Sequence, residues 1–112
     1  MSHATPASRA FHLADLLAHR ERSGLSYFEF LNVPSLHMGI YALKAGQPAP
    51  QGPHNEDEIY YVLAGRATLR LGGHEQPVES GAIAFVRAGV EHRFHTIEED
   101  LTLLVFFSAA AS

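Results

Sequence analysis

The apolar residues of this chain follow a helical spacing near the N-terminus and an alternating spacing after it. Leu13, Leu16 and Leu17 recur three or four residues apart, as on one face of a helix, and Gly24 follows as a stop signal. This spacing predicts a helix over about residues 10–22, with its apolar face lying on a sheet.

Beyond Gly24, short apolar runs alternate with clusters of turn residues. The runs are rich in β-branched and aromatic side chains, which predicts strands. The expected strands cover residues 27–31, 36–43, 59–63, 66–71, 77–79, 83–86, 91–97 and 101–107. We expect turns at Ala64-Gly65, Gly72-Gly73 and Ser80-Gly81. Many short strands at regular spacing predict an all-β sandwich or barrel.

The composition limits the function classes. The chain has 112 residues, of which 46% are hydrophobic, enough for one domain with one core. Its net charge of −4 predicts neither a nucleic-acid nor a membrane-surface partner, and no apolar run reaches membrane-spanning length. The absence of cysteine excludes disulfides, thiolate metal ligands and a thiol nucleophile. Since the N-terminus does not have the pattern of a signal peptide, we expect a cytoplasmic protein.

Two segments carry the candidate chemistry. The first runs from His54 through Glu58 to Gly65, and the second runs from Gly81 to His92. Together they supply two imidazoles and a carboxylate from separate expected strands. Zinc, iron, manganese and nickel accept these ligands from proteins, so the sequence predicts a metal pocket where the strands meet.

The same residues resemble the two motifs of the cupin family, which are roughly G-x5-H-x-H-x3-4-E-x6-G and G-x5-P-x-G-x2-H-x3-N. His54 stands at the second histidine of the first motif, and Glu58 and Gly65 have its E-x6-G spacing. The second motif is matched at Gly81, Gly89 and His92. Two motifs in the right order make the resemblance specific, although either alone is weak.

This resemblance implies a small single-domain cupin, which is an all-β jelly-roll barrel, here with a short N-terminal helix. The domain would cover residues 1–112, with a helix and arm over 1–24 and the barrel motifs over 46–107. In cupins, the motif histidines and glutamate usually hold a divalent transition metal, with iron, zinc, manganese and nickel all open here. The metal ligands that the resemblance implies for this chain are His54, Glu58 and His92.

Three positions depart from the family pattern. Gly52 replaces the first histidine, Arg87 replaces the proline and Thr96 replaces the asparagine. A one-residue shift in the loop would place the amide oxygen of Gln51 at the vacant ligand position. Gln51 is therefore either a fourth metal ligand or a solvated loop amide, and the sequence leaves both open.

Strand parity gives an independent expectation for the site. In an extended strand His54 and Glu58 face the same way. His92 shares its face with Thr96, whereas His95 points away and is not expected to bind the metal. The residues expected to line a substrate pocket are Met38, Ile40, Tyr60, Phe94, Thr96 and Phe106.

The sequence leaves the function open between three classes, because a fold does not determine a reaction. The leading hypothesis is a metal-dependent small-molecule enzyme, with oxygenase-type chemistry on a small organic acid or aromatic compound. The alternative is a non-catalytic cupin that binds a small ligand, with a structural metal or none, and the missing first histidine slightly favours it. A metal-free isomerase or epimerase would need a titratable interior, and the expected interior is too apolar.

The strand expected over residues 27–31 also predicts assembly. Its apolar side chains give it more apolar surface than one exposed edge normally carries. These side chains are Tyr27, Phe28, Phe30 and Leu31. We expect a homodimer in which this strand, with the helix before it, adds to the partner's sheet.

Overall fold

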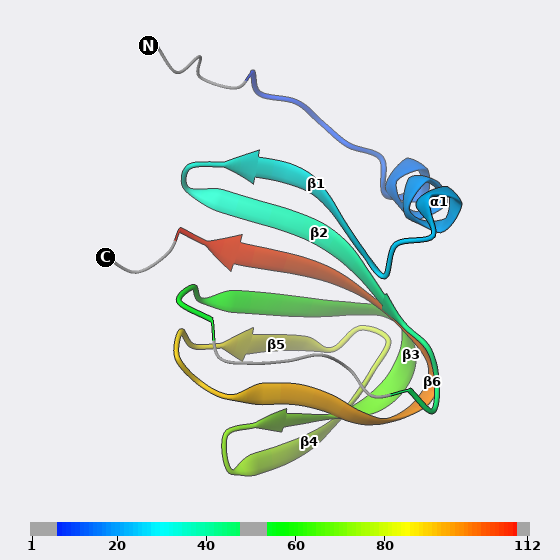
Figure 1. The fold of residues 1–112 in the computed structure, drawn as a ribbon, viewed down its shortest axis with the longest axis vertical. Coiled ribbons are helices and arrows are strands. Elements are labelled where there is room, and N and C mark those ends of the chain that lie inside the picture. Colours follow the sequence, from blue (N-terminus) through cyan, green and yellow to red (C-terminus); the bar gives the residue numbers. More distant parts are fainter. Residues whose placement is uncertain (1–6, 48–53, 110–112) are drawn as a thin grey trace.

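The computed structural model describes residues 7–47 and 54–109, which form one helix and six strands (Figure 1). The helix α1 spans Leu13–Ser23. The strands are β1 (Tyr27–Val33), β2 (Leu36–Leu43), β3 (Glu58–Leu71), β4 (His74–Glu79), β5 (Ile83–Val86) and β6 (His92–Ser108). This arrangement confirms the predicted all-β jelly-roll barrel with a short N-terminal helix.

Helix α1 ends where Gly24 adopts the left-handed conformation, with φ at 72°. The Gly24 N–H donates to carbonyls of the last turn, which caps the helix at the predicted stop. In the part of the chain that the structure describes, no helix has the length and apolar character to cross a membrane. Two ring contacts tie α1 and the segment before it to β1. His19 stacks on Phe28 with ring centroids 4.6 Å apart, and an edge-on contact joins Phe11 and Phe30 at 5.0 Å.

The strands pair in the order β1-β2-β6-β3-β4, with β5 added to β3, and all of these pairings are antiparallel. The second half of β6 lies between β2 and β3, which explains why residues 101–107 are apolar on both faces. The buried core cluster contains Leu43, Tyr60, Val62, Ala67, Leu69, Val78, Val86, Phe94, Ile97, Leu101, Leu103 and Val105.

Strands β3 and β6 are long and curl around the barrel together (Figure 1). A straight strand of 14 residues would extend about 45 Å. Yet Glu58, at the start of β3, lies against His92, which pairs with Leu71 at the end of β3. The bend falls near Gly65, where φ is 96° and the pairing with β6 shifts register. This bend brings the two candidate metal-binding segments together.

Two predicted boundaries are wrong because of the same bend. Ala64-Gly65 lies in a bulged stretch inside a continuous strand rather than in a turn, so the runs over 59–63 and 66–71 both belong to β3. The runs over 91–97 and 101–107 likewise belong to β6. A bulge and a turn share the same local sequence signal, a glycine, because both often need a residue with positive φ.

Candidate metal centre

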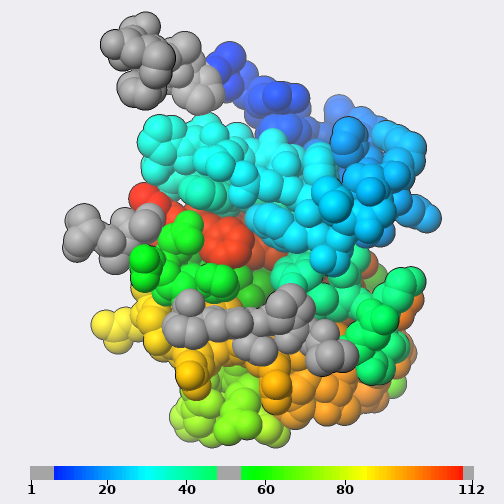
Figure 2. Space-filling view, viewed as in Figure 1, coloured from blue at the N-terminus to red at the C-terminus, as the bar shows by residue number. Residues whose placement is uncertain are grey.

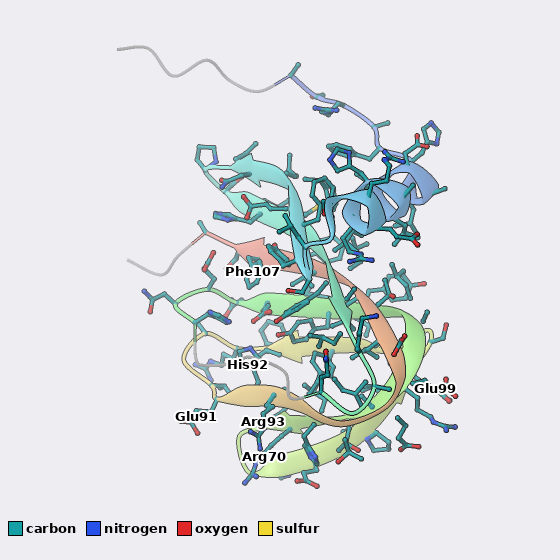
Figure 3. The ribbon with its side chains drawn as sticks, turned by 45° about the vertical axis from the view of Figure 1, so that its right-hand side comes forward. Arg70, Glu91, His92, Arg93, Glu99 and Phe107 are labelled. Atoms are coloured by element: carbon teal, nitrogen blue, oxygen red, sulfur yellow. The ribbon has the colours of Figure 1, made fainter. Side chains whose placement is uncertain are left out.

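The pleat of the sheet places one carboxylate and one imidazole inside the barrel. Glu58 begins β3, opposite Phe107 of β6 and Val86 of β5. His92 is the first residue of β6, and Phe107 lies near the other end of the same strand. Both side chains line the mouth of the barrel (Figure 3). Glu58 and His92 are 3% and 5% exposed, and they are the buried polar or charged residues among those the structure describes.

Three candidate ligand atoms converge near one point. His92 Nε2 lies 3.1 Å from Glu58 Oε1, and His54 Nε2 lies 3.9 Å from the same oxygen. One ligand atom from each residue lies within 4.8 Å of the other two. His54 comes from the segment before β3 and its side chain is 43% exposed, so the centre is accessible to solvent on that side.

The backbone holds His92 in one tautomer. Its Nδ1 lies 2.9 Å from the carbonyl oxygen of Val90, which can only accept, so Nδ1 carries the proton. In the neutral ring, Nε2 then presents a lone pair to the Glu58 carboxylate, and this contact needs a cation, either a proton or a metal ion. Burial disfavours the charged imidazolium, but the Glu58 carboxylate and the Val90 carbonyl outweigh that effect and raise the pKa of His92.

Glu58 tests whether a metal ion fits the site. Its Oε1 is buried and has no hydrogen-bond partner among the described residues, although His92 Nε2 lies only 3.1 Å away. A buried carboxylate oxygen without a partner is costly, and a cation would satisfy it. Two imidazole nitrogens and one carboxylate oxygen suit zinc, iron, manganese or nickel. The three residues therefore fit a divalent transition metal.

The centre opens into a cavity of about 270 Å³. This volume lies just below the range of pockets that enclose drug-sized ligands, so the cavity suits a small molecule. Its walls are formed by Tyr27, Tyr41, His54, Glu58, Tyr60, His92 and Phe107.

Three tyrosines add hydrogen-bond donors to this largely apolar wall. Burial and the nearby Glu58 carboxylate raise the pKa of Tyr60 and Tyr41. Burial and the carboxylates of β1 and β3, that of Glu29 first, raise the pKa of Tyr27 as well. All three phenols therefore keep their protons near neutral pH. The Tyr27 hydroxyl is buried and has no partner among the described residues, which leaves it available to a ligand.

Strand parity in β2 is the opposite of the predicted one. Met38 and Ile40 lie on the outer face of the sheet, whereas Tyr41 lines the cavity. Alternation shows which residues share a face, but it does not show which face is inward. The missed residue Tyr27 pairs with Tyr41 across the β1–β2 hairpin, but the register shifts between Glu29 and Leu31. Counting back from the turn at Pro34-Ser35 would place Phe28 opposite Tyr41, so no sequence signal identifies Tyr27.

The same inversion occurs at the end of β6. Phe107 lies opposite Glu58 and lines the cavity, so Phe106 lies on the outer face. An apolar strand that is buried on both sides offers no polar residue to distinguish its faces.

Three residues remain of those predicted to line the substrate pocket, and each lies in a different place relative to the cavity. Thr96 has φ at 51° and is exposed, in a stretch where the pairing of β6 with β3 shifts, so it does not share the face of His92. Phe94 is buried behind the cavity and packs edge-on against Tyr60, with ring centroids 4.9 Å apart. Of the six residues expected to line the pocket, Tyr60 borders it.

The other residues considered as ligands or acids lie away from the metal centre or outside the residues that the structure describes. His95 faces Glu75 of β4, with Nε2 3.1 Å from the carboxylate, which agrees with the predicted parity. Glu56 lies 4.0 Å from His37 and does not line the cavity. Gln51 lies outside the described residues, so its role as a fourth ligand stays a prediction.

The fold and the donor set define a jelly-roll protein with a possible metal centre inside its barrel. Residues 39–107 match the Cupin domain family, and the chain belongs to this family. The matched segment contains the three candidate ligands His54, Glu58 and His92.

Individual proteins are also similar to this chain in sequence or in fold. The uncharacterized protein SCO3923 of Streptomyces coelicolor is 42% identical over 104 residues, which cover 93% of this chain and 99% of that protein. The crystal structure of the DMSP lyase DddQ from Ruegeria pomeroyi is similar with a TM-score of 0.64 and 28% identity. That match covers 69% of this chain but 40% of the lyase. A cupin from Methanocaldococcus jannaschii has a TM-score of 0.69 at 19% identity, covering 75% of this chain and 79% of that one, and shows the fold alone.

Proposed function

We propose that this protein is a metal-dependent cupin enzyme that acts on a small molecule. His54, Glu58 and His92 would hold the divalent ion at the mouth of the barrel. The observation that carries the proposal is the buried Glu58 Oε1, which has no hydrogen-bond partner among the described residues although two imidazoles approach it. Two histidines and one carboxylate leave coordination positions open, as a catalytic metal requires.

The residues around the metal centre would have different roles in binding. The metal, when bound, supplies Lewis acidity and, if it is redox-active, oxygenase-type chemistry. The Val90 carbonyl fixes the tautomer of His92, so that Nε2 is the ligand nitrogen. The phenols of Tyr27 and Tyr41 donate hydrogen bonds, and Phe107 supplies an apolar wall that limits water.

Oxygenase-type chemistry on a small organic acid or aromatic compound is the leading reaction class. The donor set has the composition of the facial triad of non-heme iron oxygenases. Protonated phenols suit a carboxylate or carbonyl oxygen, and the Phe107 ring suits an aromatic or aliphatic body. The cavity of about 270 Å³ restricts the substrate to a small molecule.

The first test is elemental analysis of protein purified without chelator. We expect about one transition-metal ion per chain, in line with a single three-residue centre. Glu58→Gln keeps the shape of the side chain and removes its charge, so it should lower the metal content sharply. Glu75→Gln is the matched control, because Glu75 also lies 3.1 Å from a histidine, His95, but on the surface.

The second test separates catalysis from binding. Iron-loaded protein should consume oxygen in the presence of some members of a panel of small carboxylic acids and phenols, whereas Glu58→Gln should not. Purified protein that holds no metal, and acquires none on dialysis against the four ions, would refute the metal-dependent function. Stoichiometric metal without turnover of any panel member would favour the alternative, a non-catalytic ligand-binding cupin with a structural metal.

Lyase chemistry is a second candidate, favoured by the 28% identity to a DMSP lyase. The chain spans 40% of that lyase, so any shared activity is a proposal. Incubation of the metal-loaded protein with DMSP, followed by measurement of the remaining substrate, decides it. Loss of DMSP that depends on Glu58 supports the lyase, and unchanged DMSP excludes it.

A further inference from the structure

A second cavity lies at the opposite end of β2 and β6 from the candidate metal centre. Its volume is about 410 Å³, which is within the range of pockets that bind small molecules. The two cavities share no lining residue. Leu101 in the second cavity and Phe107 in the first are both on β6, about 20 Å apart along an extended strand. The second cavity is therefore a separate site.

The walls of this cavity come from segments that are far apart in the sequence. The last turn of α1 contributes to one side, and the end of β2 with residues 100–102 of β6 contributes to the other. Figure 1 shows α1 and the end of β2 on the right of the molecule, and the end of β6 on the left. Figure 2 shows the same right-hand side as a surface, with the helix in blue above the green segment that follows β2. The cavity thus lies where the helix meets the sheet.

Two cationic side chains line the cavity. Arg20 belongs to α1, and Lys44, the single lysine of the chain, follows β2. Arg20 NH1 donates to the carbonyl oxygen of Leu25 at 2.8 Å, which holds the guanidinium in place. Neither cation forms an ion pair within the part of the chain that the structure describes. In a chain with a net charge of −4, two such cations at one cavity indicate an anionic ligand.

The negative groups at this cavity already accept hydrogen bonds from the chain itself. Asp100 is the one acid among the described lining residues, and its Oδ1 accepts from the backbone N–H of Ala45 at 2.9 Å. The Gly24 N–H and the Ser23 hydroxyl donate to carbonyls at the end of α1, which reduces the negative potential of the helix terminus. Two positive side chains therefore face one carboxylate.

The rest of the wall supplies neutral polar groups and apolar surface. The hydroxyls of Ser26 and Thr102 and the amide of Gln47 line the cavity. The buried side chains of Leu43 and Leu101 add apolar surface beside them. Hydroxyl and amide groups can both donate and accept hydrogen bonds, so they suit the hydroxyl groups of a ligand.

We propose that this cavity binds a small hydroxylated anion, with its carboxylate or phosphate group between Arg20 and Lys44. The planar donors of the guanidinium and the ammonium group of the lysine can bind different oxygens of one anionic group. The hydroxyl groups of the ligand would bond to Ser26, Thr102 and the carboxylate of Asp100. Because the metal centre is at the other end of the barrel, this ligand and a substrate can bind at the same time.

Calorimetric titration of the full chain with three six-carbon compounds tests the proposal. Glucose 6-phosphate has hydroxyls and a phosphate, gluconate has hydroxyls and a carboxylate, and glucose has hydroxyls without a charge. We expect at least one of the two anions to bind and glucose to bind much more weakly. Binding of gluconate alone would identify a carboxylate ligand, and binding of glucose 6-phosphate alone would identify a phosphate ligand.

Variants of the two cations locate the binding. Lys44→Gln removes the charge of an exposed side chain, so it should leave the fold intact and weaken anion binding about ten-fold or more. Arg20→Gln should weaken it as well. Arg22→Gln is the matched control, because it removes the same charge from the same turn of α1 but does not line the cavity. This control and Glu58→Gln, which alters the metal centre, should both bind the anion like the parent.

Acetylation of Lys44 by acetic anhydride gives a second readout, because the chain has no other lysine. A bound anion should slow acetylation of Lys44 but not of the α-amino group, as measured by mass spectrometry. This readout and Lys44→Gln decide the question even if Arg20→Gln does not fold. Failure of both anions to bind the parent overturns the proposal, as does equal affinity in Lys44→Gln and the parent. Binding that is lost in Glu58→Gln but kept in Lys44→Gln also overturns it and places the anion at the metal centre.

Discussion

The phenol of Tyr27 lies directly over the backbone of Gly39, in space that any side chain at residue 39 would occupy. Gly39 is buried in β2 and its φ is not positive, so glycine is needed there for space rather than for backbone conformation. The missing side chain lets the ring of Tyr27 cross β2 and reach the cavity beside Tyr41. Gly39 and Tyr27 therefore act together to place a phenol beside the candidate metal centre.

Removing this phenol should weaken ligand binding without removing the metal site. Tyr27→Phe keeps the ring and deletes the hydroxyl that lacks a partner. If that hydroxyl donates to the ligand, its loss costs about 1 kcal/mol, or roughly five-fold in affinity. Calorimetric titration of the zinc-loaded protein with benzoate measures the change. Equal benzoate affinity in Tyr27→Phe and the parent would exclude Tyr27 from ligand recognition.

Gly39→Ala tests the same relationship from the other side. The added methyl group should push the Tyr27 ring away, so benzoate affinity should fall by about as much as in Tyr27→Phe. In the double variant the two losses should not add, because both act through one hydroxyl. Additive losses would show that residue 39 affects the cavity by a different route.

The metal ligands can be tested one at a time. His54→Ala and His92→Ala each remove one of three ligands, so each should abolish stoichiometric metal binding. His95→Ala should leave metal binding nearly unchanged, since His95 faces Glu75 rather than the cavity. Metal content after dialysis against zinc, measured by elemental analysis, distinguishes these cases. Loss of metal in His95→Ala with retention in His92→Ala would contradict the geometry of the centre.

Gln51 can be tested directly, although it lies outside the described residues. An amide oxygen is a weaker ligand than an imidazole for zinc or iron. If Gln51 is the fourth ligand, Gln51→Ala should weaken metal binding and Gln51→His should strengthen it. Chelator competition measures both affinities against the parent. Three equal affinities would remove Gln51 from the centre and leave three protein ligands with open positions.

The sequence predicts the parts of this site that depend on spacing. The E-x6-G pattern identifies Glu58, and the second motif identifies His92. The fold brings Nε2 of His92 to 3.1 Å from Oε1 of Glu58. Their positions in two motifs were sufficient, because each motif occupies a fixed place in the barrel. The parity of His92 and His95 was also predictable from a local pattern.

The parts that could not be predicted depend on pairing between distant strands. The inward direction of Tyr41 and Phe107 follows from the register of β2 and β3 against β6, and no local pattern encodes that register. Thr96 left its expected face because a bulge changed parity inside β6. Gly65 carried the signal of a turn and proved to be a bend within β3, since the backbone of another strand, rather than solvent, lies against it.

The bend of β3 near Gly65 couples the stability of the fold to the geometry of the metal centre. Gly65 has φ at 96°, and a Cβ there would overlap the carbonyl of Asp100 and the backbone of Leu101. Gly81 has nearly the same φ, 95°, but a Cβ there would meet nothing within 4 Å. Gly81→Ala should therefore cost only the backbone strain, about 1–2 kcal/mol. Gly65→Ala should cost clearly more, about 3–5 kcal/mol, because β6 must also move away.

Chemical denaturation of both variants gives the free energies of unfolding, and chelator competition gives their zinc affinities. Gly65→Ala should also weaken zinc binding, since the bend in β3 brings Glu58 to His92, whereas Gly81→Ala should bind zinc like the parent. Equal destabilisation of the two variants would mean that the approach of β6 to Gly65 is not tight. A destabilised Gly65→Ala that keeps the parent's zinc affinity would mean that the curl of β3 does not depend on this glycine.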